Sequence, residues 1–194
     1  RYAYVSSYAG PVQIDPNARL GCIAKVDTVT MQVVGECTVG YQPEEMVIAG
    51  NKLYVANSGG YRVPDYDRTV SVVDLDTFRE IRKIDVAINL HRMELDDNGM
   101  IWVSSRGDYY GNHSATYVID SRTDQVIERL ELLPNGNMTL CDGRLYVYST
   151  EWNYQTQSNT VTYATVDVDT RRILTRNFIT DGTDKEIRVP FGLA

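Results

Sequence analysis

The sequence predicts an all-β protein, because two short motifs recur along it at one interval and strand-like segments lie between them. The first motif is an aromatic residue followed by Val and small polar residues, as in LYVANS (53–58) and LYVYST (145–150). Its aromatics lie 50, 48 and 44 residues apart, at Tyr4, Tyr54, Trp102 and Tyr146. The second motif recurs at intervals of 47, 46 and 47 residues, at Asp27, Asp74, Asp120 and Asp167. Since two independent motifs keep one period, the chain contains four repeats.

The sequence pattern of each repeat predicts four strands. The aromatic motif is the first of them in chain order, and the segment that ends at the repeated Asp is the second. Third strands are expected in MQVVGECTV, FREIRKIDV, QVIERLELL and RRILTRNFI. Fourth strands are expected in EEMVIA, HRMELD, GNMTLC and PFGLA. Apolar residues alternate or form short runs in these segments, which is typical of strands bounded by turns.

Tight turns are expected at two points of each repeat. Asn51, Asp97-Asn98-Gly99 and Asp142-Gly143 precede aromatic strands, and these residue types adopt the positive φ of tight hairpins. The repeated Asp-x-x-Thr segments form the next connection, because Asp and Thr side chains bind nearby backbone groups. Short connections of this kind favour antiparallel pairing within each repeat.

A four-stranded antiparallel unit that recurs every 44 to 50 residues predicts a β-propeller, in which the fourth strand of each repeat is the innermost strand of the next blade. We place the repeats at 2–49, 52–97, 100–141 and 144–194. The chain enters at the second strand of one blade and stops after the first strand of another, which would leave unpaired edges in an open array. We therefore expect a fragment of a larger ring, with a closed four-bladed ring as the alternative.

The composition excludes some classes of protein. The chain has 194 residues, of which 43% are hydrophobic and 23% charged, as in globular domains. A net charge of −7 argues against nucleic acid as a partner, because affinity for phosphate backbones needs clustered Lys and Arg. No apolar run approaches the roughly 18 residues of a transmembrane helix.

The three cysteines do not indicate a disulfide scaffold or a Cys-x-x-Cys zinc site, because they are few and widely spaced. We expect Cys22, Cys37 and Cys141 to be small buried residues. Cys22 and Cys37 flank one predicted hairpin, so a disulfide between its two strands is the alternative.

The segments LYVANSGG (53–60), TVSVVDLDT (69–77) and VPFGLA (189–194) resemble the YVTN-type propeller repeat of bacterial surface-layer-like proteins. The resemblance extends over all four repeats. It implies a seven-bladed ring, export, and a lipoprotein of the bacterial outer surface or periplasm that captures nutrients, including corrinoids, for an outer-membrane uptake transporter. It transfers no ligand contact, because its matching residues are structural: Tyr54, Val55, Asn57, Asp74 and Thr77.

Long connections gather at one end of the predicted blades, at residues 7–20, 58–68, 106–114 and 150–159, whereas the other end has tight turns. Aromatic rings with a polar edge suit sites that contact sugars or ring-bearing ligands. We therefore predict a binding rim, whose candidate residues are Tyr61, Tyr66, Tyr109, Tyr110, His113, Trp152 and Tyr154. The alternative is that these side chains brace the loops.

A second set of candidates lies where the chain enters the innermost strands. Aligning Met46, Met93 and Met138 places four residues at one equivalent position, near the mouth of a central channel: Glu45, Arg92, Asn137 and Phe191. We predict that these residues contact the ligand. A polar, water-filled channel without a function is the alternative.

Signals for catalysis are weak. His91 and His113 are the only histidines, and no further ligand recurs at metal-like spacing. PDYDR (64–68) offers carboxylates to calcium without the regular spacing of a dedicated loop. No nucleophile motif such as G-x-S-x-G occurs, so we assign no catalytic residue and no metal ligand.

Arg106-Gly107-Asp108 invites an adhesion hypothesis, and Asn112 and Asn137 fit the glycosylation pattern.

These observations together favour a non-catalytic, extracytoplasmic propeller that captures a small molecule or glycan at its long-loop end for nutrient uptake. One alternative is a lactonase-like or other metal-assisted hydrolase at the channel mouth. A second alternative is a platform for protein interactions.

Overall fold

The computed structural model describes residues 1–108, 111–132, 137–153, 155–176 and 178, which form fifteen strands and no helix. The strands form four antiparallel sheets, so the all-β prediction is confirmed. Within this described part of the chain, no helix has the length and apolar character needed to cross a membrane.

The described strands follow the predicted order, and the last expected strand, PFGLA, lies outside the described residues. The first sheet has three strands, β1 (Tyr2–Ser7), β2 (Cys22–Asp27) and β3 (Gln32–Thr38). The second contains β4 (Pro43–Ala49), β5 (Lys52–Asn57), β6 (Thr69–Asp74) and β7 (Arg79–Asp85). The third contains β8 (Leu90–Leu95), β9 (Met100–Ser105), β10 (Ala115–Asp120) and β11 (Gln125–Leu130). The fourth contains β12 (Asn137–Cys141), β13 (Arg144–Asn153), β14 (Ser158–Asp167) and β15 (Ile173–Thr175).

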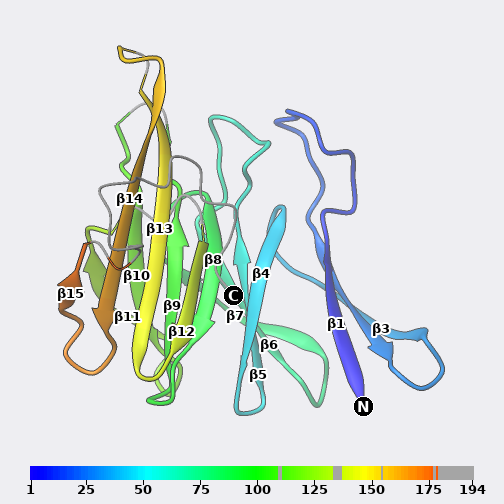
Figure 1. Cartoon of the computed structure of the whole chain (residues 1–194). Coiled ribbons are helices and arrows are strands. Elements are labelled where there is room, and N and C mark those ends of the chain that lie inside the picture. The colour runs from blue at the N-terminus through cyan, green and yellow to red at the C-terminus, as the bar shows by residue number, and fades with distance from the viewer. Residues whose placement is uncertain (109–110, 133–136, 154, 177, 179–194) are drawn as a thin grey trace.

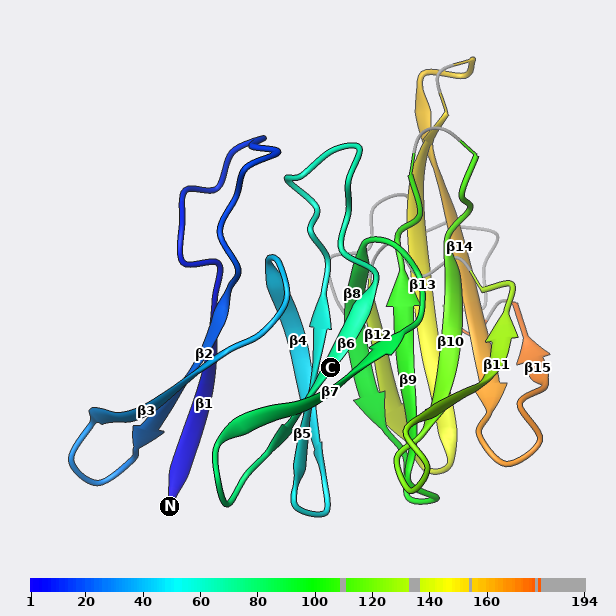
Figure 2. The same cartoon turned by 180° about the vertical axis from the view of Figure 1, so that it is seen from behind.

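The four sheets stand side by side as propeller blades (Figures 1 and 2). The innermost strands β4, β8 and β12 follow one another across the array, and β8 contacts both of the others. The connections after β1, β5 and β9 rise from one end of the blades, and tight turns close the other end (Figure 1). We call the first of these the long-loop end. Four repeats therefore correspond to four blades, as the sequence predicts.

Three apolar clusters fill the spaces between neighbouring sheets. Leu53 and Val55 face the first sheet, where they pack with Ile23. Tyr54 lies between them in β5 and faces the third sheet, where it packs with Ile101. Successive residues of a strand point to opposite faces, so every inner blade needs apolar residues on both faces. This requirement explains the continuous apolar runs of β5 and β9.

The connection between the second and third strand of each blade repeats in geometry as well as in sequence. The carboxylate of Asp74 accepts hydrogen bonds from the amide and the hydroxyl of Thr77, at 2.8 and 2.7 Å. The turns predicted from Asp-x-x-Thr are thus confirmed. Each of these turns ends in a residue with positive φ, between 51° and 56°, at Met31, Phe78, Asp124 and Arg171.

Two local predictions are wrong. Residues 150–159 are not a loop, because β13 and β14 pair as far as Asn153 and Ser158 and form a ribbon that projects beyond the other strands (Figure 1). The cysteines are free, and only Cys37 is buried, whereas Cys141 is exposed. Cys37 pairs with Ile23 rather than with Cys22, so the two hairpin cysteines point to opposite faces of the first sheet and are not placed for a disulfide.

Candidate functional site

The innermost strands of the second and third sheets each carry a β-bulge at the long-loop end. In β4 one extra residue lies between the paired positions Pro43 and Met46. In β8 the same irregularity lies between Leu90 and Met93. A bulge turns side chains out of the regular alternation of a strand. Each bulge presents two adjacent polar residues, Glu44 and Glu45 from β4, and His91 and Arg92 from β8.

The predicted alignment of the three innermost strands is confirmed by their pairing. Each methionine pairs with the valine that follows the repeated aromatic, in the pairs Met46 with Val55, Met93 with Val103 and Met138 with Val147. Glu45, Arg92 and Asn137 therefore occupy one equivalent position, immediately before these methionines. Phe191, the fourth member of this predicted set, lies outside the described residues.

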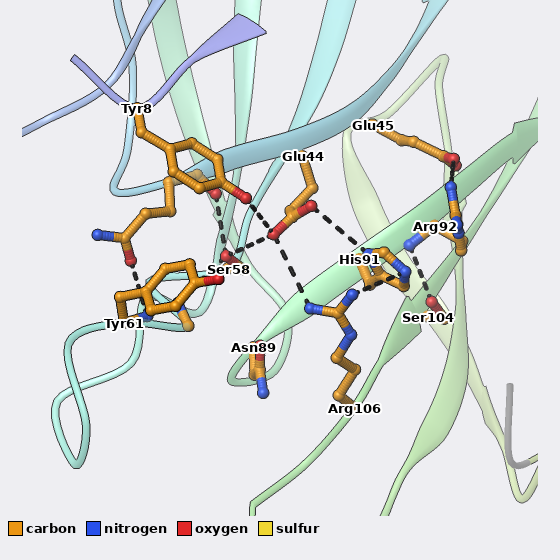
Figure 3. A network of polar contacts seen from close by, with 12 residues as sticks. Tyr8, Glu44, Glu45, Ser58, Tyr61, Asn89, His91, Arg92, Ser104 and Arg106 are labelled. Carbon is orange, nitrogen blue, oxygen red and sulfur yellow. Dashed lines mark hydrogen bonds and ion pairs between the residues drawn. The ribbon is translucent and has the colours of Figure 1, made fainter. Parts of the chain in front are cut away.

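Glu44 is the centre of a polar network that joins three blades (Figure 3). Its Oε1 accepts hydrogen bonds from the hydroxyls of Tyr8 and Ser58, at 2.9 and 3.1 Å. Its Oε2 lies 3.6 Å from Nδ1 of His91, and Nη1 of Arg106 lies 3.9 Å from Oε1. Nη2 of Arg106 contacts Nε2 of His91 at 2.9 Å. We call these five residues the Glu44 network.

Three members of the network occupy the same position in three different repeats. Tyr8, Ser58 and Arg106 are each the first residue after the aromatic strand of their blade, β1, β5 and β9 respectively. The strands converge toward the bulge of β4, so equivalent positions with different side chains meet at one carboxylate. The backbone positions are equivalent in the three repeats, but their side chains differ, so the resulting site is not symmetric.

The protonation states in the network follow from its contacts. Burial works against ionisation of Glu44, but the contacts from His91 and Tyr8 and the charge of Arg106 outweigh it and lower the pKa of Glu44. Burial lowers the pKa of His91, and the positive charges of Arg106 and Arg92 add to this effect against the opposing influence of Glu44. A neutral His91 accepts from Arg106 at Nε2 and carries its proton at Nδ1, toward Glu44.

Tyr8 is kept protonated in the same environment. Burial and the neighbouring carboxylate of Glu44 both raise the pKa of the Tyr8 hydroxyl. The hydroxyl therefore remains a hydrogen-bond donor to Glu44 near neutral pH.

The Arg-Gly-Asp tripeptide is folded into this arrangement instead of being presented to solvent as a unit. The guanidinium of Arg106 contacts His91 and Glu44. Gly107 has a φ of 67°, and a Cβ at this position would lie 2.0 Å from the carbonyl oxygen of Asn112. Oδ1 and Oδ2 of Asp108 accept from the backbone and side-chain nitrogens of Asn112, at 2.9 and 2.6 Å. The structure therefore explains the three residues by local folding.

A second polar pair lies beside the network, at the predicted channel-mouth position. Arg92 forms an ion pair with Oε1 of Glu45, and Oε2 of Glu45 accepts from the amide of Met93 at 2.9 Å. The amide of Arg92 donates to Oγ of Ser104 at 2.9 Å. The structure thus brings Glu45 and Arg92 together across the second and third blades.

A cavity of about 300 Å³ opens next to the network, between the residues of the loop that connects β1 and β2 and Gln42. Its lining includes Tyr8, Pro11, Asp15, Asn17, Arg19 and Gln42. We call it the Tyr8 cavity.

The loop over the Tyr8 cavity is held by the second blade. The amide of Asp15 donates to the carbonyl of Tyr61 at 2.8 Å, and the amide of Tyr61 donates to Oε1 of Gln42 at 3.1 Å. The rings of Tyr8 and Tyr61 lie 6.3 Å apart, between their centroids. Tyr61, a predicted rim residue, therefore contacts three residues of the cavity lining but does not line the cavity itself.

Of the other rim candidates, the two whose side chains the structure describes, Tyr66 and His113, are not part of the cavity lining. Tyr66 is half-buried in the loop after β5, and His113 is exposed in the loop after β9. Tyr109, Tyr110 and Tyr154 lie outside the described residues, as does the side chain of Trp152. The rim prediction stays a prediction for these four residues.

In the segment PDYDR (64–68), the carboxylate of Asp67 has a structural role. Oδ1 of Asp67 accepts from the amide and hydroxyl of Thr69, at 2.9 and 2.7 Å, and Oδ2 accepts from the amide of Tyr41 at 2.8 Å. Within the described ranges, no group of three or more His, Cys, Asp or Glu residues is placed to hold a metal ion. The prediction of no cofactor, with calcium as its alternative, is left untested.

Sequence reasoning missed Glu44 and Ser58 and did not connect Arg106 with His91. A signal was present, because Glu44-Glu45 and His91-Arg92 each place two consecutive polar residues at the entry of an apolar strand. Consecutive polar residues do not fit strict alternation, and a bulge accommodates them.

Comparison with known proteins supports the fold. The chain matches no protein-family model and no curated protein sequence. Among solved structures it is similar to hydrazine synthase of Kuenenia stuttgartiensis, with a TM-score of 0.60 and 20% identity over 86% of this chain and 48% of that one. It is also similar to the dihydro-heme d1 dehydrogenase NirN in complex with DHE, with a TM-score of 0.58 and 15% identity over 82% of this chain and 33% of that one.

The chain thus spans about half, or a third, of the length of these structural neighbours. Both neighbours are β-propeller proteins, and identities of 20% and 15% show the fold alone. The YVTN-type repeat and the surface-layer relationship stay predictions.

Proposed function

We propose that this propeller binds a small molecule at its long-loop end, in the Tyr8 cavity, without transforming it chemically. The observation that carries the proposal is that the cavity adjoins a preassembled polar network. Tyr8 lines the cavity and donates to Glu44, while Gln42 lines it and accepts from Ser58 through its carbonyl. A concave site with a few fixed polar groups is typical of small-molecule binding.

The size and composition of the cavity support this proposal. A volume of about 300 Å³ lies at the lower end of the range for small-molecule sites. Its lining combines the apolar surfaces of Ala9, Pro11 and Ala18 with the polar side chains of Asn17 and Gln42. Because the loop is fixed to Tyr61 by a backbone hydrogen bond, the site needs little rearrangement to accept a ligand.

The biological setting belongs to the same proposal. The resemblance to YVTN-type repeats supports an exported, surface-bound protein that captures a nutrient and passes it to an uptake transporter. A lipoprotein signal upstream in the full gene product would agree with this setting, and a cytoplasmic start would contradict it. The hydrolase and protein-interaction alternatives stay predictions, because no contact described above favours either.

A binding screen with a cavity-filling variant tests the proposal. Gly10 lines the cavity, and a Cβ added there meets only the carbonyl oxygen of Tyr8, at 3.9 Å. Gly10→Trp should therefore fill the cavity without disturbing the blades. Val29→Trp adds the same ring to a residue that is 83% exposed at the opposite end of the first sheet.

The screen uses ligand-observed NMR with sugars, amino acids, carboxylic acids, phosphate esters and corrinoids. We expect hits that bind the wild type and the Val29→Trp variant but lose at least tenfold in affinity with Gly10→Trp. Hits that bind all three proteins equally would place the site elsewhere. An absence of hits across every class would overturn small-molecule binding.

A further inference from the structure

We infer that the molecule bound at this site carries an oxyanion, a carboxylate or a phosphate, which binds Arg19 in the Tyr8 cavity and Arg106 in the adjoining Glu44 network. The inference rests on the proposed function and names the chemistry of its ligand.

Arg106 is oriented by the protein but keeps most of its hydrogen-bonding capacity. A guanidinium carries five N–H donors. In the described part of the chain, that of Arg106 makes one hydrogen-bond-length contact, to His91 at 2.9 Å, and lies 3.9 Å from Glu44, beyond hydrogen-bonding distance. Its side chain is 38% exposed. Several donors therefore remain available to a ligand.

Of the two neighbours of Arg106 in the network, Glu44 compensates part of its positive charge and His91 compensates none of it. His91 accepts through Nε2 and is neutral, so it orients the guanidinium without cancelling its charge. The carboxylate of Glu44 is the one anion beside Arg106 in the described network, and its Oε1 already accepts from Tyr8 and Ser58. An arginine held by a neutral acceptor is preorganised for a bidentate contact with a carboxylate or phosphate.

A second cation faces the cavity from its loop. Arg19 lines the Tyr8 cavity, and no hydrogen bond or ion pair joins it to another described residue. Arg106 does not line the cavity itself; it faces Oε1 of Glu44, which also accepts from the hydroxyl of Tyr8, a residue of the cavity lining. Asp15 also lines the cavity, but its Oδ1 already accepts from the amide of Asn17 at 2.8 Å.

Matched probes separate this inference from the proposed function. We would measure the affinities of glucose, glucuronate and glucose 6-phosphate, and of benzamide, benzoate and phenyl phosphate. Each set keeps one body and changes its charged group. We expect an anionic member to bind at least tenfold more tightly than its neutral counterpart, with the comparison of carboxylate and phosphate showing which oxyanion the site prefers.

Two charge-removing variants test the assigned residues. Arg106→Gln and Arg19→Gln should each weaken binding of the anionic probe about tenfold, and higher salt should weaken it further. Arg122→Gln, which removes the same charge from an exposed tight turn, should leave the affinity unchanged. Because Arg19 has no described partner, its variant reports on binding even where Arg106→Gln lowers stability.

The outcomes are distinct. Equal binding of neutral and anionic probes, or anion binding that survives both variants, would overturn the inference and leave the cavity as a ligand site. Failure of all six probes would count against the inference, while binding of other molecules in the broader screen would still support the proposed function. Loss of anion binding in both arginine variants, with Arg122→Gln unaffected, would establish the inference that Arg19 and Arg106 bind the oxyanion.

Discussion

Nη2 of Arg106 lies 2.9 Å from Nε2 of His91, and this pair faces Glu44 of the neighbouring blade. The second and third sheets are therefore joined by polar contacts at the long-loop end. They are also joined at the opposite end, where the hydroxyl of Tyr54 donates to Asp124 at 2.5 Å. The apolar cluster between these sheets is thus closed at both ends by hydrogen-bonded side chains, which fixes how the two blades sit against each other.

Glu44→Gln should lower the free energy of unfolding by about 2 kcal/mol. The amide keeps the size of the side chain but removes the charge that Tyr8, Ser58, His91 and Arg106 face. Denaturant unfolding of the full chain measures the change. Glu131→Gln is the matched control, because Glu131 is 69% exposed and its ion pair should contribute less than about 1 kcal/mol. Equal stability of the two variants would show that Glu44 has no structural role.

Acidification from pH 8 to pH 5 should destabilise the protein through His91. Its pKa in the folded state is below the ordinary value because of burial and the charges of Arg106 and Arg92. The unfolded chain then binds the proton more readily, so this contribution is present above about pH 6.5 and is lost as the pH falls below it. Urea midpoints across this range should shift less for His91→Gln than for the wild type.

The control for the pH experiment is His113→Gln, which replaces the exposed histidine of the third blade. It should retain the pH dependence of the wild type. Glu44 adds a separate effect with the same sign at lower pH, because its pKa is lowered and its contribution is lost below about pH 4.5. A His91→Gln variant that keeps the full dependence between pH 8 and pH 5 would contradict the assignment.

The blade architecture was accessible from the sequence because it depends on local patterns that recur. The Asp-x-x-Thr turns form because each Asp side chain binds the backbone two or three residues later, a contact within one short segment. The alignment of Met46, Met93 and Met138 holds because each repeat keeps one strand register. Positive φ at Met31 and Phe78 has no signal in the residue type, since both side chains disfavour that conformation.

The ribbon at 150–159 differs from the other three long connections in composition. Residues 7–20, 58–68 and 106–114 contain Gly or Pro, which interrupt strands, whereas residues 150–159 contain neither. Thr150 to Asn153 and Ser158 to Thr160 therefore continue the antiparallel pairing, and only the tip turns. Composition was thus the better guide here than equivalence between repeats.

Only part of the candidate site could be predicted from the sequence. The repeat alignment predicts the positions of Glu45 and Arg92. Their neighbours Glu44 and His91 are turned toward the site by β-bulges, and the sequence does not specify where these bulges lie. The contact of Tyr8 with Glu44 joins residues that are 36 apart in the chain and depends on how the first two blades pack. Such long-range contacts cannot be read from local periodicity.

Tyr54→Phe should lower the free energy of unfolding by about 1 to 2 kcal/mol. Tyr54 is fully buried, and its hydroxyl proton is shared between Oδ1 of Asp124, at 2.5 Å, and the carbonyl of Ser121, at 2.9 Å, in the next blade. Loss of the hydroxyl leaves buried acceptors with fewer donors, although Lys52 still contacts Asp124. Thermal and urea unfolding would measure the effect. Tyr117→Phe, which removes a hydroxyl that contacts the exposed Arg129, should change stability by less than about 0.5 kcal/mol.

The last prediction separates the Tyr8 cavity from the aromatic rim that the sequence suggests. The cavity belongs to the loop of the first sheet, whereas Trp152 belongs to β13 of the fourth, with two sheets between them (Figure 1). A molecule small enough for about 300 Å³ should therefore depend on one of these places. Tyr8→Ala should cost about 2 kcal/mol of binding, as loss of an aromatic anchor does, and Trp152→Ala should cost less than about 0.5 kcal/mol.

Calorimetric titration of each variant with the tightest hit from the screen would decide between the two sites, with melting temperatures recorded to confirm folding. If Trp152→Ala, or the double variant Tyr109→Ala with Tyr110→Ala, weakened binding as much as Tyr8→Ala, one ligand would contact both places. The rim would then be part of the site, and the ligand would have to extend well beyond the cavity. Unchanged affinity in both rim variants, with a loss in Tyr8→Ala, would restrict recognition to the loop of the first blade and the Glu44 network beneath it.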